Sequence, residues 1–207
     1  MTKVLPILSI LIPIHARDKK FVKSFDSILI PDGVSFEILV YNDGSKISIK
    51  ENLSSYKYLK NTQFFDSTIQ KGISHALNFL IKKSKGIYLF RFDADDFFLN
   101  DRIDKQLKYI SEKGLYSVCF SSVKYKKDRY FNSDISLFEF KFHNPVIHPT
   151  VVFLKNMLNG YKYSELNEHT LFEDYELFHR MRSDGIKFFK ERESLLIYNL
   201  INKKMKN

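Results

Sequence analysis

This chain has very little cysteine, and the segment that follows its first apolar stretch contains no glycine. Among the 207 residues there are one cysteine and seven glycines. The single cysteine, Cys119, excludes an intramolecular disulfide framework and a cluster of thiolate metal ligands, and it suits a reducing compartment. The segment Pro13–Arg17, which follows the first apolar stretch, contains no glycine. A glycine-rich phosphate-binding loop is therefore not expected there.

Long apolar runs are also lacking. The apolar stretch Val4–Ile14 is too short to cross a membrane. It contains two prolines and lacks the small-residue cleavage site of a signal peptide. Because no other segment approaches membrane length, we expect a soluble, cytoplasmic protein without a signal peptide.

Positive charge, in contrast, is in excess. The chain has 33 Lys and Arg against 24 Asp and Glu, a formal net charge of +9. Such an excess favours polyanionic partners, and a nucleic-acid-binding module is one alternative. That module would need clustered basic residues and a recognisable motif, whereas the basic residues are scattered except in the tail Asn202–Asn207, so no nucleic-acid partner is expected. The tail lysines would each add about 1 kcal/mol to contact with an anionic membrane, which leaves open a peripheral position at the inner face of the cell membrane.

The stretch Lys85–Asp96 combines a buried strand with a group of carboxylates. Apolar and aromatic residues, interrupted by Arg91, lead into three aspartates. Such a run is typical of a strand in a parallel sheet, and the carboxyl end of such a strand lies at the edge where open α/β sheets bind ligands. Asp93 and Asp95 point the same way along an extended chain, and paired carboxylates suit Mg²⁺ or Mn²⁺. The alternative is that they cap a helix beginning near Asn100.

Strands and helices are expected to alternate before this stretch. The expected strands are Leu8–Ile12, which Pro13 would stop, then Phe36–Tyr41 and Thr62–Phe65, and the expected helices are Lys19–Leu29 and Gly72–Lys83. Alternation of this kind implies parallel βαβ units, so the strands carry their polar ends to one edge. We therefore predict an α/β fold in which His15, Arg17, Asp43, Asp93 and Asp95 converge.

Two further features are ambiguous. Arg91 interrupts an apolar strand, and because a buried guanidinium must be paired, Asp93 or Asp95 is its expected partner. Tyr116–Phe142 alternates apolar and basic residues, which indicates solvent-facing strands or a loop over the site, or else a half-buried antiparallel strand.

Together these motifs resemble glycosyltransferase family 2. The similar segments, in chain order, are Ser9–Pro13, Glu37–Ser45, Gly86–Asp96, His148–Phe153 and Glu173–Leu177. Within that family, Arg91–Asp96 and Asn144–Thr150 are similar to bacterial enzymes that build O-antigens, capsules and lipooligosaccharides. The resemblance implies a GT-A fold, which is a single Rossmann-like domain over residues 1–207 with a mostly parallel central sheet flanked by helices. Residues 1–100 would bind the nucleotide sugar and residues 101–207 the acceptor.

The resemblance also implies an activity and a set of site residues. The activity is inverting, metal-dependent transfer of a hexose or N-acetylhexosamine from a nucleotide diphosphate sugar, with UDP as the expected nucleotide. The acceptor would be a lipid-linked glycan or an oligosaccharide. Asp95, with Asp93, would bind Mn²⁺ or Mg²⁺, and Asp174, with Glu173 beside it, falls at the position of the catalytic base. The residues implied in donor binding are Pro13, His15, Arg17, Asp43, Arg91, Asp93 and His148.

The chemistry of sugar transfer requires groups of these kinds. A cation and basic side chains stabilise the charge that grows on the leaving diphosphate, and a carboxylate removes the proton of the attacking hydroxyl. Each residue also has a structural alternative: Asp174 as a capping acid in the first turn of a helix over Tyr175–Met181, and His148 as a satisfied histidine at the start of a strand. A nucleotidyl- or sugar-phosphate transferase is the alternative enzyme, although it would normally need the missing glycine-rich loop.

Overall fold

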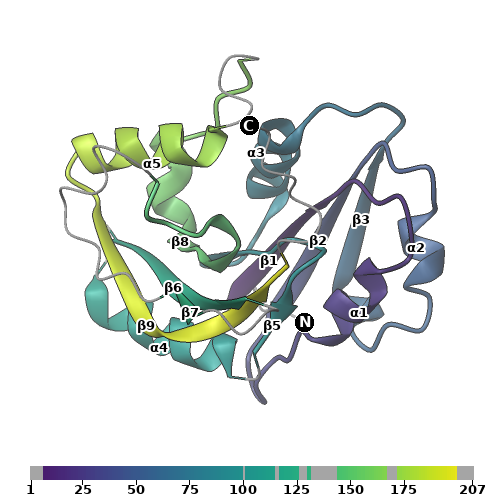
Figure 1. The fold of residues 1–207 in the computed structure, drawn as a ribbon, viewed down its shortest axis with the longest axis horizontal. Coiled ribbons are helices and arrows are strands. Elements are labelled where there is room, and N and C mark those ends of the chain that lie inside the picture. The colour runs from purple at the N-terminus through teal and green to yellow at the C-terminus, as the bar shows by residue number, and fades with distance from the viewer. Residues whose placement is uncertain are drawn as a thin grey trace, which may run out of the picture.

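A mixed sheet forms the centre of the molecule (Figure 1). The computed structural model describes residues 7–99, 101–114, 117–125, 130–131, 144–166 and 172–199. The strands are β1 (Leu8–Ile14), β2 (Phe36–Asp43), β3 (Thr62–Ser67), β4 (Tyr88–Arg91), β5 (Phe97–Phe98), β6 (Ser117–Tyr125), β7 (Tyr130–Phe131), β8 (Val152–Leu154) and β9 (Lys187–Tyr198). The helices are α1 (Phe21–Asp26), α2 (Ile49–Asn52), α3 (Ile73–Lys83), α4 (Arg102–Lys113) and α5 (Glu173–Ser183), with short 3₁₀ segments η1 (Leu59–Asn61), η3 (His148–Thr150) and η4 (Lys155–Gly160).

The order of the strands carries most of their carboxyl ends to one edge. The order is β3-β2-β1-β4-β8-β6-β9-β5, and β7 pairs with β6. The first four strands are mutually parallel, β8 is antiparallel to both β4 and β6, and β9 is parallel to β6 but antiparallel to β5. Along this order of described strands, β8 and β5 alone run against the others. The prediction of an α/β fold with a mostly parallel sheet is therefore confirmed.

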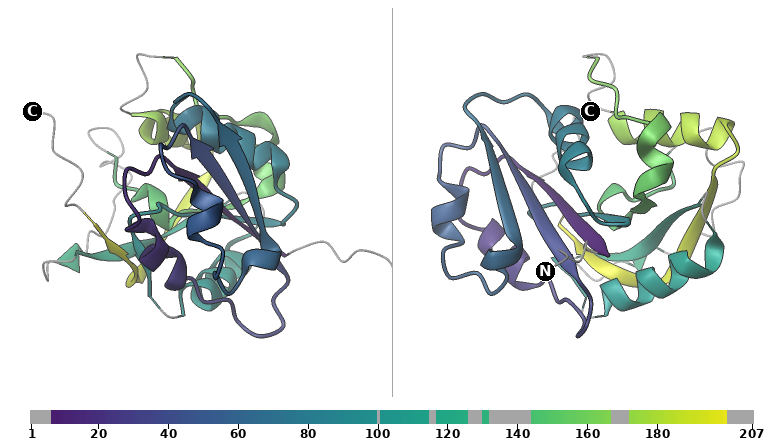
Figure 2. Two further views of the ribbon diagram at one scale, coloured as in Figure 1. Left: turned by 90° about the vertical axis from the view of Figure 1, so that its right-hand side faces the viewer. Right: turned by 180° about the vertical axis from the view of Figure 1, so that it is seen from behind.

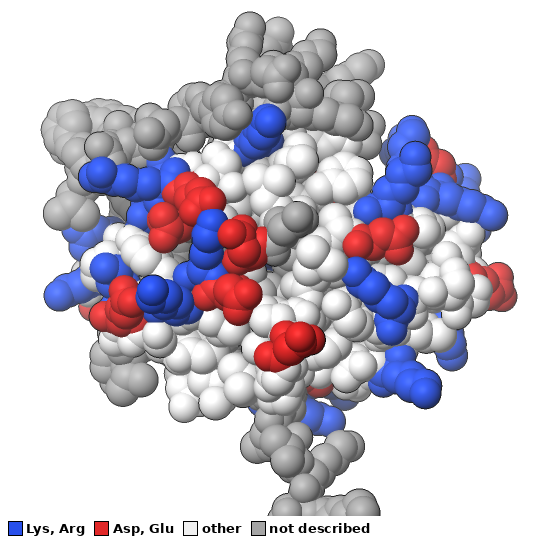
Figure 3. Space-filling view, turned by 90° about the horizontal axis from the view of Figure 1, so that it is seen from below, with Lys and Arg blue, Asp and Glu red and all other residues white. Residues whose placement is uncertain are grey.

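Helices cover both faces of the curled sheet. α3 and α5 lie over the concave face, and α4 lies on the opposite face beneath β6 and β9, with α1 and α2 towards the β3 end (Figures 1 and 2). Blue side chains predominate on the α1–α2 side in Figure 3, where Lys19, Lys20, Lys23, Lys50 and Lys57 are exposed, whereas acidic and basic side chains are interspersed over the α4 side. Among the described helices, none combines the length and the apolar character that a membrane span needs.

Burial on both faces explains why the parallel strands are such continuous apolar runs. In β1 every residue except Pro13 is buried, and in β2 every residue after Phe36 is buried. Gly86 is needed where β4 approaches β1, because a Cβ atom there would lie 2.5 Å from the backbone nitrogen of Ser9. The close approach of these two strands therefore depends on the missing side chain.

Several predicted boundaries are wrong by a few residues, and β2 and β3 each end two residues later than predicted. β1 does not stop at Pro13 but continues to Ile14. Its pairing with β4 ends at Leu11, so Pro13 lies where β1 has a neighbour on one side, a position at which a strand tolerates proline. The helix expected over Lys19–Leu29 is shorter, because α1 ends at Asp26, with Ser27 as its C-cap residue.

The interpretation of Tyr116–Phe142 as solvent-facing strands or a loop is wrong for its first part. Ser117–Val123, within β6, is buried throughout and lies between β8 and β9 in the sheet. The alternation of basic residues begins only at Lys124, after the buried stretch. The alternative of an antiparallel strand agrees with the pairing of β6 with β8, although Ser117–Val123 is fully buried and not half-buried. Apart from Tyr130–Phe131, the residues from 126 to 142 lie outside the described part of the chain.

Candidate active site

Three carboxylates converge where β4 ends. Asp93, Asp95 and Asp96 each offer an oxygen, and these oxygens lie within 4.8 Å of one another. The turn that gathers them is closed by the Asp96 amide, which donates to the Asp93 carbonyl at 3.1 Å. The buried carboxylate of Asp96 also accepts a hydrogen bond from the Asn199 amide, at 2.9 Å, just past the end of β9. Three hard oxygen donors in this space fit a divalent cation such as Mg²⁺ or Mn²⁺.

Arg91 pairs with the first of these carboxylates, which confirms one of its two expected partners. Its Nη2 lies 2.5 Å from Oδ1 of Asp93, and its side chain is 1% exposed. Burial acts to lower the pKa of Arg91, but Asp93, together with Tyr163 and Asp96, raises it overall. The guanidinium therefore stays charged, and it fixes one oxygen of Asp93 at the bottom of the site.

A pocket of about 520 Å³ adjoins the carboxylates. Asp93 and Asp95 line it together with Pro13 at the end of β1 and with His15 and Arg17 in the loop that follows. Further lining residues are Ile14, Ala16, Asp18, Lys20, Phe21 and Ala94. The lining therefore combines carboxylates with basic side chains, of which Lys20 pairs with Asp18 at 2.8 Å, and such a lining suits an anionic ligand bound together with a cation.

Asp43 lies behind this pocket and organises its wall. Its two carboxylate oxygens accept from the backbone amides of Lys71 and Gly72, at 2.7 and 2.9 Å, just before α3. Its carbonyl oxygen lies 2.7 Å from Nδ1 of His15. Gly44, with φ of 73°, is required next to it, because a Cβ atom would come within 2.8 Å of the backbone of the loop before α3. Asp43 therefore joins the loop after β1 to the start of α3.

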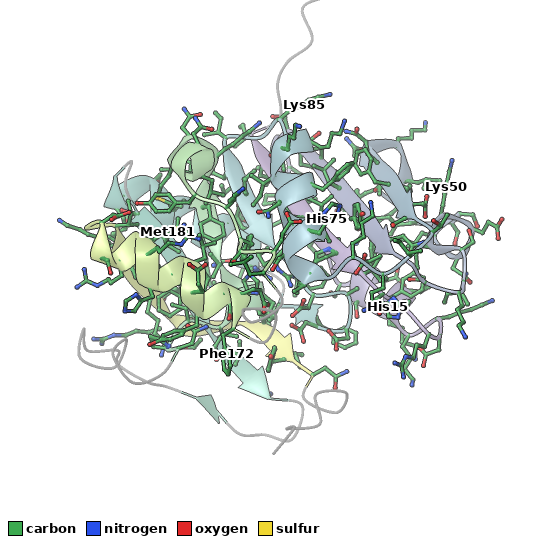
Figure 4. All side chains as sticks on the ribbon, turned by 90° about the horizontal axis from the view of Figure 1, so that it is seen from above. His15, Lys50, His75, Lys85, Phe172 and Met181 are labelled. Carbon is green, nitrogen blue, oxygen red and sulfur yellow. The ribbon has the colours of Figure 1, made fainter. Side chains whose placement is uncertain are left out.

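A second group of carboxylates lies at the start of α5. Oδ2 of Asp174 accepts from the side-chain amide of Asn144 at 2.8 Å, and Oδ1 lies 2.7 Å from the backbone nitrogen of Tyr175. His148 is buried next to this pair, with Nδ1 4.0 Å from Oε1 of Glu173 and 4.0 Å from Oδ2 of Asp174. Viewed from above, Phe172 at the start of α5 and His15 after β1 lie towards one end of the molecule, Lys85 lies at the other, and His75 on α3 lies between them (Figure 4).

The two carboxylate groups interact electrostatically. Burial raises the pKa of Glu173 to about 7, and the neighbouring charge of Asp174 acts in the same direction. Arg91 lowers this pKa and Asp93 raises it, so both residues of the β4 end act on Glu173. The carboxylates after β4 and those at the start of α5 are therefore near enough for their charges to interact, whereas Asp43, His148, Glu173 and Asp174 are not among the lining residues of the pocket.

Glu173→Gln is expected to stabilise the free protein increasingly as pH rises. Below pH 4.5 the wild-type carboxyl is neutral whether the chain is folded or unfolded. Between pH 4.5 and about 7 the unfolded chain loses its proton first, so the wild type loses stability by up to about 3 kcal/mol. Glutamine has no proton to lose, and urea denaturation of both proteins at pH 5 and pH 8 measures the difference.

The matched control is Glu112→Gln, an exposed glutamate on α4. Its stability relative to wild type is expected to stay the same at both pH values. If the stability of Glu173→Gln relative to wild type were also the same at pH 5 and pH 8, the conclusion that ionisation of Glu173 destabilises the folded protein would be wrong.

A buried arginine that the sequence did not single out joins the two halves of the site. Arg102, at the start of α4, is fully buried, and its Nη2 donates to the carbonyls of Arg91 at 2.9 Å and Pro149 at 2.7 Å. Its Nε donates to Gln106, and Gln106 donates to the carbonyl of Thr150 at 2.7 Å. Helix α4 thereby holds the end of β4 next to η3, which carries His148.

Arg102→Met is expected to lower the free energy of unfolding by about 3 kcal/mol, because it leaves buried carbonyl groups without donors while keeping most of the side-chain volume. Chemical denaturation measures this effect. Lys108→Met, an exposed cation on the same helix, is the control and should change stability by less than about 0.5 kcal/mol. Equal stability of the two variants would show that these hydrogen bonds do not hold the segments together.

Comparison with known proteins was made on sequence and on structure. The sequence model of Glycosyl transferase family 2 matches residues 9–181. The O-antigen biosynthesis glycosyltransferase WbnJ of Escherichia coli is 28% identical over 219 residues, covering 97% of this chain and 82% of that protein. An uncharacterized glycosyltransferase of Rickettsia bellii is 33% identical over 120 residues, covering 58% of this chain and 17% of that relative. The chain spans less than a fifth of the length of the Rickettsia relatives that it matches.

Two solved structures show the same fold. The mannosyltransferase PcManGT from Pyrobaculum calidifontis, in complex with GDP-Man and Mn²⁺, superposes with a TM-score of 0.77 at 16% identity, covering 97% of this chain and 59% of that one. TarS 1-349 of S. aureus, in complex with UDP-GlcNAc, gives a TM-score of 0.73 at 16% identity, covering 93% and 58%. At this identity the likeness concerns the fold.

Proposed function

The chain belongs to glycosyl transferase family 2, and from that premise we propose that it is an inverting, metal-dependent transferase that moves a hexose or N-acetylhexosamine from a nucleotide diphosphate sugar to a glycan. One observation carries this proposal. The carboxylates of Asp93, Asp95 and Asp96 lie at the end of β4, and Glu173, beside Asp174, is near enough to Arg91 and Asp93 for their charges to act on it. A donor held at the first group would present its sugar to a base in the second.

On the donor side, the chain's own residues supply both signs of charge. Asp95 and Asp93 would hold the cation, with Asp96 beside them, and the bound cation would neutralise charge on the leaving diphosphate. Arg17 and Lys20 line the same pocket and can approach the phosphates. His15 and Pro13 form the wall on which the nucleoside would rest. Asp43 supports that wall by its bonds to His15 and to the start of α3, and a direct contact of its carboxylate with the base stays a prediction.

On the acceptor side, Asp174 would act as the general base. The acceptor oxygen forms a bond to the anomeric carbon while the bond from that carbon to the diphosphate oxygen breaks. Asp174 takes the hydroxyl proton, and the nucleoside diphosphate leaves with the electron pair of the broken bond. Attack from the face opposite the leaving group inverts the anomeric centre. Asn144 fixes one oxygen of Asp174, so the base is oriented before the acceptor arrives.

Several finer assignments rest on the relatives. The complexes of structural neighbours with UDP-GlcNAc and GDP-Man support a nucleotide-sugar donor, and UDP remains the expected nucleotide. The similarity to an O-antigen transferase supports a lipid-linked or oligosaccharide acceptor in surface polysaccharide synthesis. A cytoplasmic location, peripheral contact with the inner face of the membrane, and the division into residues 1–100 for the donor and 101–207 for the acceptor belong to the same proposal.

A thermal-shift screen of nucleotide sugars, with and without Mn²⁺, tests this function. We expect at least one UDP-sugar to raise the melting temperature only when Mn²⁺ is present. UDP alone with Mn²⁺ should give a smaller shift in the same direction. Stabilisation by none of the donors, together with salt-dependent binding of DNA, would instead favour a nucleic-acid-binding module.

A further inference from the structure

His148 lies between a buried tyrosine and the two carboxylates of α5. Its Nε2 is 2.8 Å from the hydroxyl oxygen of Tyr163, and its Nδ1 is 4.0 Å from both Glu173 and Asp174. Tyr163 is 1% exposed and His148 is 8% exposed. The two ring nitrogens therefore face different partners in a site that is mostly shielded from water.

Helix α3 holds the backbone of Tyr163 in place. Its backbone amide donates to Oδ1 of Asn78 on α3, and its carbonyl accepts from Nδ2 of the same side chain, both at 2.9 Å. Asn78 also donates to Glu165, which pairs with His75 one turn earlier on α3. Because both backbone groups of Tyr163 are bonded to one helix, its hydroxyl has little freedom to move away from His148.

The partners on both sides of the imidazole select the same tautomer. Burial raises the pKa of the Tyr163 hydroxyl, so this group keeps its proton and can donate it to Nε2. On the other side, ionised carboxylates of Glu173 and Asp174 can only accept. A lone pair on Nε2 can accept the Tyr163 hydroxyl proton, and a proton on Nδ1 faces the carboxylates electrostatically at 4.0 Å, whereas the reverse tautomer would turn a lone pair towards two negative charges.

We propose that Tyr163 is a positioning residue for sugar transfer, whose hydroxyl donates to Nε2 of His148 and thereby keeps the Nδ1–H of that ring turned towards Asp174. This inference rests on the proposed function, in which Asp174 is the base. An Nδ1–H facing Asp174 at 4.0 Å attracts its carboxylate electrostatically and favours the orientation that carboxylate has before the acceptor arrives. Within the described part of the chain, the charged groups that face His148 and Tyr163 include Glu173 and Asp174 from α5 and Arg91 and Asp93 from the end of β4.

The tautomer itself can be measured without any substrate. In protein labelled with ¹⁵N-histidine, the two ring nitrogens of His148 report by NMR which of them carries the proton, and His148→Gln identifies their signals. At pH 8, where Glu173 is ionised, we expect Nδ1–H in the wild type and a loss of that preference in Tyr163→Phe. An Nε2–H tautomer in the wild type would overturn the proposal, whatever the activity of the enzyme.

The kinetic test uses water as the acceptor, with UDP-GlcNAc and Mn²⁺ as the probe and release of UDP as the readout. We expect Tyr163→Phe to lower kcat about 10- to 100-fold, to leave KM for UDP-GlcNAc unchanged, and to move the acid limb of the pH profile to higher pH. The matched control is Tyr161→Phe, two residues before Tyr163 in the chain. It removes a surface hydroxyl that donates to Asp184, and it should change none of these values.

Two results separate positioning from mere structural support. A fall in kcat with an unmoved pH profile, or equal kcat in both tyrosine variants, would overturn the proposal. In a His148→Gln background, Tyr163→Phe should have no further effect on kcat, because it acts through the ring. If wild-type protein released no UDP at all, the proposed function would be in doubt, and the NMR result would still decide the role of Tyr163.

Discussion

Asp95→Asn is expected to abolish metal-dependent binding of the nucleotide-sugar donor. Asparagine keeps the size of the side chain but removes the charge that a divalent cation requires from its ligands. Without this carboxylate, the pocket would hold the diphosphate with basic side chains alone. Isothermal titration with the donor identified by the thermal screen, at fixed Mn²⁺, should give at least 100-fold weaker binding, or about 2.7 kcal/mol.

The position of Asp95 makes this a test of a site and not of overall charge. Asp95 lines the pocket after β4 and belongs to the group of three carboxylates. Asp104→Asn removes the same charge from an exposed position on α4 and should leave the affinity unchanged. Donor binding by Asp95→Asn with wild-type affinity and wild-type dependence on Mn²⁺ would show that the cation, if the enzyme uses one, binds elsewhere.

Asp174→Asn is expected to separate binding from chemistry. The residue lies at the start of α5, apart from the carboxylates of β4, so donor affinity should remain within about twofold of wild type. The amide cannot accept the hydroxyl proton, so turnover should fall by about 10²- to 10⁴-fold, which is the usual contribution of a general base. Titration with the donor and release of nucleoside diphosphate measure the two effects on the same samples.

The neighbours of Asp174 sharpen the interpretation of that result. Asp184→Asn, at the other end of α5, removes an equal charge and should preserve both binding and turnover. Glu173 adjoins Asp174, and its raised pKa would let it share a proton at neutral pH. Full turnover by Asp174→Asn would therefore remove it as the base and leave Glu173 as the candidate.

Features that depend on neighbouring residues in the chain could be predicted from the sequence. The apolar runs of β1, β2 and β4 and the amphipathic spacing of α3 follow from local patterns. The pairing of Arg91 with Asp93 follows from their two-residue separation and from the cost of leaving a buried guanidinium unpaired. The convergence of Asp93 with Asp95 was predicted for an extended chain, and that reason is wrong, because β4 ends at Arg91 and a turn at Ala94–Asp95 brings Asp93, Asp95 and Asp96 together.

Features that depend on contacts between distant segments could not be predicted. The place of β6 inside the sheet is set by its pairing with β8 and β9, which no local pattern encodes. Tyr163 reaches His148 while its backbone is bonded to Asn78, 85 residues earlier, and no local pattern encodes that contact. Arg102 did leave a signal, since it shares the buried face of α4 with Gln106 and Ile110, four and eight residues further along the helix.

The central claim is that the carboxylates after β4 hold a cation and the donor diphosphate, opposite the base of α5. A crystal of the protein grown with Mn²⁺ and UDP tests it most directly, because the anomalous signal of manganese locates the ion without reference to its ligands. We expect one strong peak about 2.1 Å from a carboxylate oxygen of Asp95, with the diphosphate of UDP on its pocket side. A peak at another surface, or UDP bound in the pocket with no manganese beside Asp93, Asp95 or Asp96, would contradict the account.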